Sequence, residues 1–209
     1  MTCTWPLPFV LFWGWSTLCL SWFGLCYALH KPKWLLRKGK EGINTLYLLL
    51  NLPWLSVTYL IFGLERLFSR EAMWNQIGDT PLFIGAYPWN SGELGAFDWI
   101  IDLTAEFPRS APHHPGYCAL PNLDGMPLES IPLPNWKSTD TILIHCAQGH
   151  GRSALLAAFV LQHMGFVNDF HAGLALVRKS RPKAIPNQFQ CQKMQDLINR
   201  GRTQTANSS

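Results

Sequence analysis

Charged side chains are scarce in this chain: Asp, Glu, Lys and Arg make up 14% of its 209 residues, whereas hydrophobic residues make up 48%. This composition is too apolar for one ordinary globular domain, and it indicates an additional apolar segment. The net charge of +4 is small, and no long basic stripe occurs after residue 70. A nucleic-acid-binding surface would carry such a stripe, so we expect no nucleic-acid partner.

The cysteines lack the spacing of a metal site or a redox pair. None of the six belongs to a Cys-x-x-Cys pair, and no cluster of metal-ligating residue types stands out. We therefore expect neither a metal nor a cofactor. Cys3, Cys19 and Cys26 fall in or beside the first apolar run, where they behave as small hydrophobes. The other three cysteines lie further along the chain, at Cys118, Cys146 and Cys191.

Two long runs lack charge altogether. From Trp5 to Leu29 the run exceeds the ~30 Å hydrocarbon core of a bilayer at about 1.5 Å per helical residue. The run from Ile43 to Leu64 contains Pro53, which makes a bent or re-entrant helix as compatible as a straight one. A signal peptide would need a basic start, which Met1 to Pro8 lacks. We predict a membrane-anchoring region over residues 1–70 with transmembrane helices at 5–29 and 43–64.

The positive charges near these runs bear on membrane topology. Five cations lie between the two runs: Lys31, Lys33, Arg37, Lys38 and Lys40. Only Arg66 and Arg70 follow closely after the second run. The positive-inside rule puts the connecting loop in the cytoplasm and both termini outside it. A re-entrant second run would return the rest of the chain to the cytoplasmic side. We expect a multi-pass membrane protein, with both topologies open.

From residue 71 onward, the pattern predicts an α/β domain that ends near residue 202, followed by a flexible tail at 203–209. Short β-rich segments alternate with turn signals and are followed by helical patterns that end at Gly or Pro. The predicted strands are 82–84, 99–103, 117–120 and 141–145, and the predicted helices are 152–164, 168–180 and 186–200. We expect a mostly parallel central sheet flanked by helices.

Residues 145–153 read His-Cys-Ala-Gln-Gly-His-Gly-Arg-Ser, with an apolar strand before them and an apolar helix after them. A five-residue loop in this position can turn its backbone N–H groups toward one point, and Gly149 and Gly151 permit the angles that this requires. A phosphate dianion fits such a loop. The start of the following helix favours an anion and the thiolate form of Cys146, while Arg152 can grip two phosphate oxygens at once.

Cysteine, five residues and arginine in this context resemble the signature of cysteine-dependent tyrosine and dual-specificity phosphatases. The resemblance covers roughly Asp79 to Arg200 and implies catalysis through a cysteinyl phosphate. It further implies that Ser153 hydrogen-bonds the sulfur and that His145 orients the loop. The five loop residues would bind the phosphate: Ala147, Gln148, Gly149, His150 and Gly151.

Such enzymes also use an aspartate upstream of the cysteine as general acid. Asp124, in the turn Leu-Asp-Gly, fits that description, although the helix that usually follows is reduced at 128–139, where Pro132 and Pro134 interrupt it. Asp102, at a strand end, is the rival. By resemblance, the segment with Gln188 and Gln190 positions the hydrolytic water, but a polar helix start explains both glutamines equally well.

The substrate is indicated only by class. The loop carries no Lys, which argues against inositol polyphosphates, and a membrane anchor raises the local concentration of lipid phosphates. We predict a membrane-associated phosphatase acting on a phosphoprotein or on a phospholipid such as phosphatidylglycerophosphate. The alternatives are a phosphate-binding pseudophosphatase or scaffold, and a thiol redox enzyme in which Cys118 or Cys191 resolves or regulates Cys146.

Overall fold

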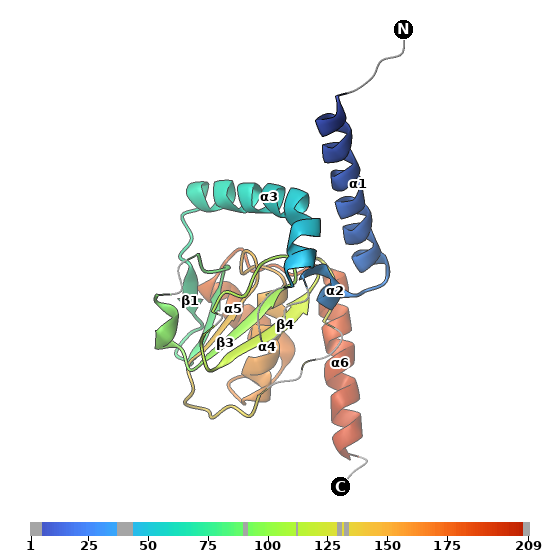
Figure 1. Ribbon diagram of the computed structural model, residues 1–209. Coiled ribbons are helices and arrows are strands. Elements are labelled where there is room, and N and C mark those ends of the chain that lie inside the picture. The colour runs from blue at the N-terminus through green and yellow to red at the C-terminus, as the bar shows by residue number, and fades with distance from the viewer. Residues whose placement is uncertain are drawn as a thin grey trace. The chain divides into compact units, whose positions relative to one another are not determined.

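The computed structural model describes residues 6–36, 44–89, 92–111, 113–128, 131 and 134–206. For residues 201–206 it describes only the backbone. The chain forms two compact units: Met1–Glu71 with Ala105–Arg109, and Ala72–Thr104 with Ser110–Ser209. Figure 1 labels the elements along the chain. Arg37, Lys38 and Lys40 of the predicted basic loop, and Pro132, lie outside the described residues.

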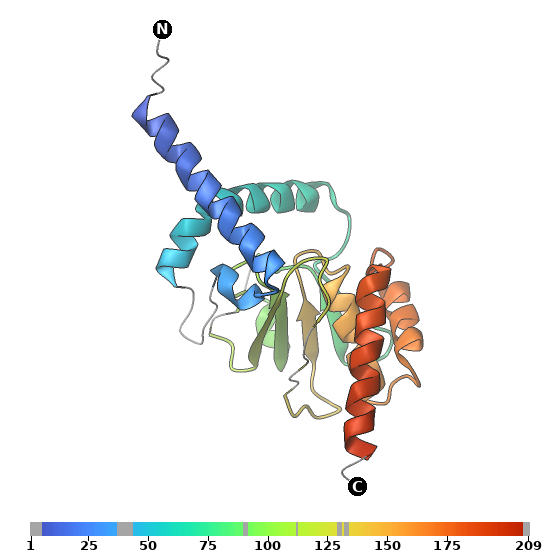
Figure 2. The ribbon, with the colours of Figure 1, turned by 90° about the vertical axis from the view of Figure 1, so that its right-hand side faces the viewer.

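The first unit is helical and consists of α1 (Leu7–Ala28), α2 (Pro32–Leu36) and α3 (Thr45–Phe68). Asn44 caps α3, because its side chain accepts a hydrogen bond from the backbone N–H of Leu46. Pro53 lies inside α3, where it removes one backbone donor, and the helix is bent rather than straight (Figures 1 and 2). A bent helix is among the forms that the sequence left open for this run.

Aromatic rings and one buried amide hold the three helices together. Trp22 of α1 stacks on Trp34 of α2 with ring centroids 6.0 Å apart. The Asn51 side chain of α3 is fully buried and donates to the Leu35 carbonyl at 2.9 Å, which satisfies an acceptor at the end of α2. Phe107, from the separate segment of this unit, packs against α3 through the rings of Tyr59 and Phe62.

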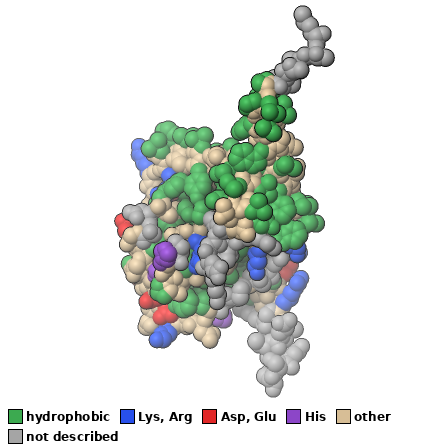
Figure 3. Space-filling model, in the orientation of Figure 1, with side chains coloured by type: hydrophobic (Ala, Val, Ile, Leu, Met, Phe, Trp, Pro, Cys, Tyr) green, Lys and Arg blue, Asp and Glu red, His purple; other side chains and the backbone are tan. Residues whose placement is uncertain are grey.

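The outer surfaces of α1 and α3 are apolar. Figure 3 shows hydrophobic side chains gathered over α1. The two helices, of 22 and 24 residues, are long and apolar enough to cross a membrane, and only 11% and 17% of their most apolar windows are buried. A core helix of a water-soluble protein would be mostly buried, so burial inside this chain does not account for their composition. The assignment of residues 1–70 to a membrane anchor stays a prediction.

A five-stranded sheet of order β1-β2-β5-β3-β4 forms the centre of the second unit. The strands are β1 (Trp74–Gln76), β2 (Leu82–Gly85), β3 (Trp99–Thr104), β4 (Tyr117–Asn122) and β5 (Ile142–His145). Three pairings are parallel, and only β1 is antiparallel to its neighbour. The predicted mostly parallel sheet is therefore confirmed, and the four longer strands lie where the sequence predicts them. The described residues between β4 and β5 contain no helix, in line with the predicted reduction.

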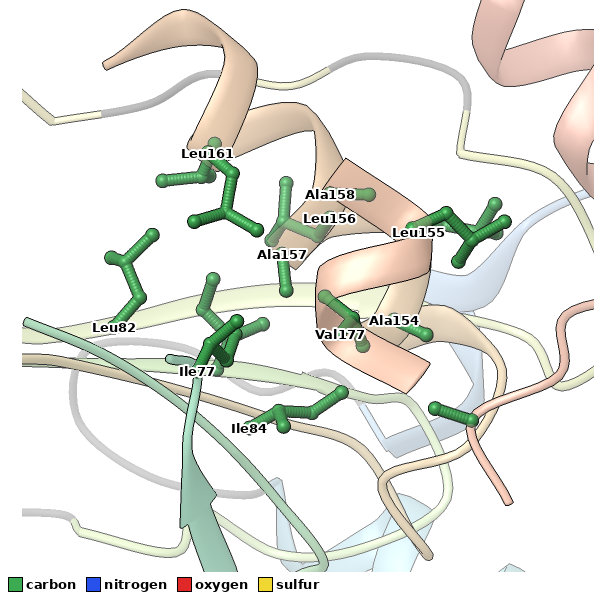
Figure 4. Packing of buried hydrophobic residues seen from close by; sticks show 14 of the residues in the cluster. Ile77, Leu82, Ile84, Ala154, Leu155, Leu156, Ala157, Ala158, Leu161 and Val177 are labelled. Carbon is green, nitrogen blue, oxygen red and sulfur yellow. The ribbon is translucent and has the colours of Figure 1, made fainter. Parts of the chain in front are cut away.

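Helices pack on one face of this sheet. Alternate strand residues such as Ile84, Ile101 and Ile144 join the core with α4 (Arg152–His163), α5 (Phe170–Ser180) and α6 (Gln188–Ala206). Figure 4 shows Ala157 of α4 and Val177 of α5 on the same side of Ile84. The other face carries a smaller cluster of five buried residues under the short 3-10 helix η1 (Leu94–Ala96): Leu94, Phe97, Ile100, Ala111 and Leu143.

Local signals explain where these helices begin and end. Asp169 caps α5 by accepting from the Ala172 N–H at 2.8 Å. Gly165, with φ of 79°, follows the end of α4 as predicted. Gly173 lets α5 approach α4 closely, since a Cβ there would lie 2.6 Å from the Ala158 carbonyl oxygen. The buried helix α4 is thereby fixed, and with it the loop that precedes its first residue.

Candidate active site

The carboxyl ends of four parallel strands meet at one edge of the sheet. β2, β5, β3 and β4 all run in the same direction, so Gly85, His145, Thr104 and Asn122 end side by side. The loops that leave these strands converge there, as is usual for binding sites in α/β sheets. The predicted phosphate loop is one of them.

This loop runs from Cys146 at the end of β5 to Arg152 at the start of α4. The Cys146 sulfur lies 3.3 Å from the Gly149 backbone N–H and 3.4 Å from Ser153 Oγ, and its side chain is almost fully buried. The thiolate is the form of cysteine that attacks an electrophile. Ser153 is thus in contact with the sulfur, where the resemblance puts it.

Gly149 is required for the shape of the loop. Its φ is 79°, and a Cβ there would lie 2.6 Å from the backbone C and O of Gly85 and 2.9 Å from Arg181 Nε. No side chain fits without displacing the end of β2 or a buried guanidinium. The loop can therefore close tightly under a ligand only because this residue is glycine.

Arg152 is held by backbone carbonyls. Its Nη1 donates to the Asn122 carbonyl at 2.7 Å and to the Leu103 carbonyl at 3.3 Å, and its side chain is 1% exposed. The carbonyls come from the ends of β4 and β3, so the sheet itself fixes the plane of the guanidinium. Its Nε lies 3.3 Å from Asp124 Oδ1. Arginine and the predicted acid are thus next to each other, with the carboxylate 75% exposed.

Asp102, the rival acid, has a different environment. It is fully buried, it accepts from Thr104 Oγ1 at 2.6 Å and from the hydroxyl of Tyr117, and it lies 4.0 Å from His145. Strand alternation puts Asp102 and His145 on the face opposite α4. His145 is buried there with Nε2 2.8 Å from Ser110 Oγ, so this cluster braces β5 just before the cysteine. These contacts account for Asp102 by a structural role, and the assignment of Asp124 as the acid stays a prediction.

Arg181 also contacts the phosphate loop, although the sequence analysis gave this residue no role. Its buried guanidinium donates to the Gln148 carbonyl of the loop at 2.8 Å and to Asn75 Oδ1 of β1 at 2.8 Å. Tyr87, after β2, donates its backbone N–H to the Ala147 carbonyl at 2.9 Å. These two bonds turn loop carbonyls outward, which leaves N–H groups to face the centre of the loop. The only signal in the sequence was an arginine directly before Pro182.

The remaining predicted binding residues line the loop at intermediate exposure. Ala147, Gln148, His150 and Gly151 are half-buried, and Gly149 is buried. Of the two glutamines, Gln190 is 3% exposed and its Oε1 would lie 3.8 Å from a Cβ on Gly151, whereas Gln188 is exposed. Among the described residues, no group of three His, Cys, Asp or Glu is arranged to hold a metal ion.

The other cysteines are poorly suited to react with Cys146. Burial raises the pKa of the Cys118 thiol, and burial, opposed by Arg178, raises that of Cys191. Cys118 pairs with Ile101 of β3, which pairs with Ile144 of β5. Cys118 is therefore two strands away from Ile144 across the sheet, and Cys146 lies two residues beyond Ile144 along the chain. At the usual spacing of strands and of residues within a strand, the Cα atoms of Cys118 and Cys146 are about 12 Å apart, beyond the ~7 Å limit for a disulfide. The register argues against this pairing.

Comparison with known proteins shows similarity at the level of structure. No protein-family model matches the chain, and no curated protein matches its sequence. A putative dual specificity phosphatase from mouse, solved in complex with zinc tungstate, is 19% identical, with 66% of this chain and 96% of that chain covered at a TM-score of 0.49. About two thirds of this chain is thus similar in structure to that phosphatase.

Two human proteins give similar values. For DUSP28 the identity is 16%, with 60% of this chain and 93% of that chain covered, at a TM-score of 0.45. For a tyrosine phosphatase-like serine/threonine/tyrosine-interacting protein the identity is 18%, with 60% and 95% covered, at a TM-score of 0.48. At such identities the likeness concerns the fold, and the chemistry proposed below depends on the geometry of the loop itself.

Proposed function

We propose that this chain is a membrane-associated phosphatase that hydrolyses phosphate monoesters through a cysteinyl-phosphate intermediate. The observation that carries the proposal is the position of the Cys146 sulfur inside a loop that ends at the N-terminus of α4. The sulfur accepts a backbone N–H at 3.3 Å, and a buried arginine follows in the first turn of the helix. Thiolate, N–H groups and guanidinium together form a site for a phosphate dianion.

In the first step, the Cys146 thiolate attacks phosphorus and the bond from phosphorus to the ester oxygen breaks. Arg152 binds two of the equatorial oxygens with its Nε side, the side that pairs with Asp124 in this structure. The bound dianion would displace the Asp124 carboxylate from Arg152 and bring it beside the leaving oxygen. Asp124 then donates its proton to the departing oxygen, so that an alcohol leaves rather than an alkoxide.

In the second step, water attacks the phosphorus of the intermediate and the sulfur leaves as thiolate. The Asp124 carboxylate accepts the proton from the water, which restores its starting state. Ser153 Oγ, 3.4 Å from the sulfur, stabilises the leaving thiolate by donating a hydrogen bond. Inorganic phosphate is the product. Because nucleophile, arginine and acid are all present, we favour an active enzyme over a phosphate-binding scaffold.

The substrate in this proposal is a phosphoprotein or a phospholipid such as phosphatidylglycerophosphate. Two helices that are long and apolar enough to cross a bilayer support attachment to a membrane, where lipid phosphates are concentrated. The loop offers no lysine to a second phosphate group, which supports a monoester with a single charged group. A multi-pass membrane location belongs to the same proposal.

The test uses the full chain in mild detergent, under reducing conditions and with chelator present. We expect hydrolysis of 4-nitrophenyl phosphate, inhibition by vanadate and no turnover by Cys146→Ser. Cys118→Ser is the matched control and retains activity, because that thiol lies on β4 outside the loop. Reduced, folded wild type without activity would leave the phosphate-binding scaffold as the better reading.

A further inference from the structure

The predicted acid lies in a turn at residues 123–126, called the acid loop below, which the Met126 N–H closes by donating to the Leu123 carbonyl at 3.2 Å. Asp124 is 75% exposed and precedes Gly125, whose φ is 72°. An exposed side chain on a glycine turn samples many orientations unless its backbone is held. A general acid works only when its proton lies within hydrogen-bond reach of the leaving oxygen, so something must fix this turn.

The first turn of α6 makes hydrogen bonds to this loop. Asn187 Nδ2 donates to the Gly125 carbonyl at 3.3 Å, and Gln190 Nε2 donates to the Met126 carbonyl at 3.1 Å. Asn122 Nδ2, at the end of β4, also donates to the Met126 carbonyl, at 3.0 Å. Two consecutive carbonyls after Asp124 are thus bound by side chains from two elements.

Asn187 and Gln190 also bind each other. Asn187 Oδ1 accepts from the Gln190 N–H at 2.8 Å, and Gln190 Oε1 accepts from the Asn187 N–H at 3.2 Å. This reciprocal pattern is a capping box that begins α6. A capping box uses only the two side-chain oxygens. The two amide nitrogens are not needed for it, yet both are directed at the acid loop.

We propose that Asn187 and Gln190 are positioning residues that hold the acid loop in its working conformation. The inference rests on the proposed function and concerns the proton-transfer part of the same site. Both ends of the Gln190 amide are engaged by the protein, the oxygen by Asn187 and the nitrogen by Met126. Gln190 therefore acts on Asp124 through the loop backbone.

Two substitutions separate capping from loop positioning. Gln190→Glu and Asn187→Asp keep the side-chain oxygens that cap α6 but replace each amide nitrogen, so the donors to Met126 and Gly125 are lost. Gln188→Glu adds the same charge at the neighbouring exposed position and serves as control. Thermal unfolding of each variant checks that the fold is kept.

The readout is the dependence of kcat/KM on leaving-group basicity across aryl phosphates from 4-nitrophenyl to phenyl. Loss of proton donation slows phenyl phosphate and spares 4-nitrophenyl phosphate, whose leaving group needs no proton. We expect Gln190→Glu and Asn187→Asp to lower phenyl phosphate turnover by about 10- to 100-fold and 4-nitrophenyl phosphate turnover by less than about 3-fold. Asp124→Asn gives the same pattern, and Gln188→Glu behaves as wild type.

Double variants that combine Asp124→Asn with Gln190→Glu test whether Gln190 acts through Asp124. In an Asp124→Asn background, Gln190→Glu should have no further effect on phenyl phosphate, because the acid that it positions is already absent. A further loss there, or an equal loss on both substrates in the single variants, overturns the positioning role. Wild type that turns over neither ester overturns the proposed function, and the inference with it.

Discussion

Two fully buried arginines, Arg152 and Arg181, shape the phosphate loop. A buried guanidinium is costly unless its donors find acceptors, and here backbone carbonyls accept from Nη1 of Arg152 and from Nη2 of Arg181. Arg181 pulls one loop carbonyl outward, and Arg152 is fixed by the carbonyls at the ends of β3 and β4. The planar fork of arginine makes this possible, whereas a lysine has a single flexible ammonium and would not span these acceptors.

At the scale of single residues, one prediction concerns the reactivity of the cysteine thiols. Because burial raises the pKa values of Cys118 and Cys191, both remain protonated at neutral pH and should alkylate slowly until the pH rises above the ordinary range of a thiol. We expect iodoacetamide at pH 7 to modify Cys146 first, as mapped by mass spectrometry, with vanadate protecting it. Labelling of Cys118 or Cys191 ahead of Cys146 would contradict this and revive the redox alternative.

At the scale of elements, the site depends on strand ends and helix starts rather than on strand interiors. Four parallel strands bring their last residues to one edge, and the starts of α4 and α6 supply the arginine and the bonds to the acid loop. At the opposite edge of the sheet, hydrogen bonds link the segments that precede β3 and β5. Asp98, before β3, accepts from the backbone N–H and the hydroxyl of Thr141, before β5, both at 2.8 Å.

These bonds give a pH dependence of stability. The hydrogen bonds from Thr141 hold the pKa of Asp98 below its ordinary value. A depressed pKa means that the stabilisation is fully present above the unfolded value of about 4 and is lost as the pH falls through the lower folded value. Wild type should therefore be more stable than Asp98→Asn at pH 7, and the difference should shrink below pH ~4 in urea unfolding. A difference that is constant with pH would contradict the assignment.

At the scale of the whole molecule, the chain consists of an apolar helical unit and an α/β unit. Five residues inserted between β3 and β4, Ala105–Arg109, belong to the helical unit, where Phe107 packs on Tyr59 and Phe62. The chain thus passes between the units more than once, so they are not two modules joined by one linker. Cleavage or truncation at residue 71 alone would leave Phe107 without its aromatic neighbours.

Membrane attachment is the prediction that belongs to this scale. Leu18 and Leu60 lie within the two apolar helices, with 64% and 63% of their surfaces exposed. Arginine near the centre of a transmembrane helix costs about 2.5–3.5 kcal/mol on insertion scales. We expect the wild type to stay in the membrane pellet after alkaline carbonate, and the Leu18→Arg, Leu60→Arg double variant to become extractable. The Leu18→Met, Leu60→Met pair is the control and should stay in the pellet; release of wild type by carbonate would rule out spanning helices.

The sequence by itself determined the features that depend on neighbouring residues. Hydrophobic runs, Gly and Pro signals and the Cys-x5-Arg spacing located the four longer strands, the α4 to α6 helices and the phosphate loop, because strand and helix periodicity and loop length are local properties. The three-residue strand β1 was missed, since it is too short to show alternation and exists only by pairing with β2.

Only the tertiary structure distinguishes the surroundings of Asp124 from those of Asp102. Both follow β-rich segments in the sequence, but strand register sends Asp102 to the face opposite α4 and brings Asp124 within 3.3 Å of Arg152. The roles of Arg181, Asn187 and Gln190 likewise depend on contacts with residues 33 to 109 positions away. Such contacts are set by how the strands and helices pack, and no spacing along the chain records which distant carbonyl a buried donor will meet.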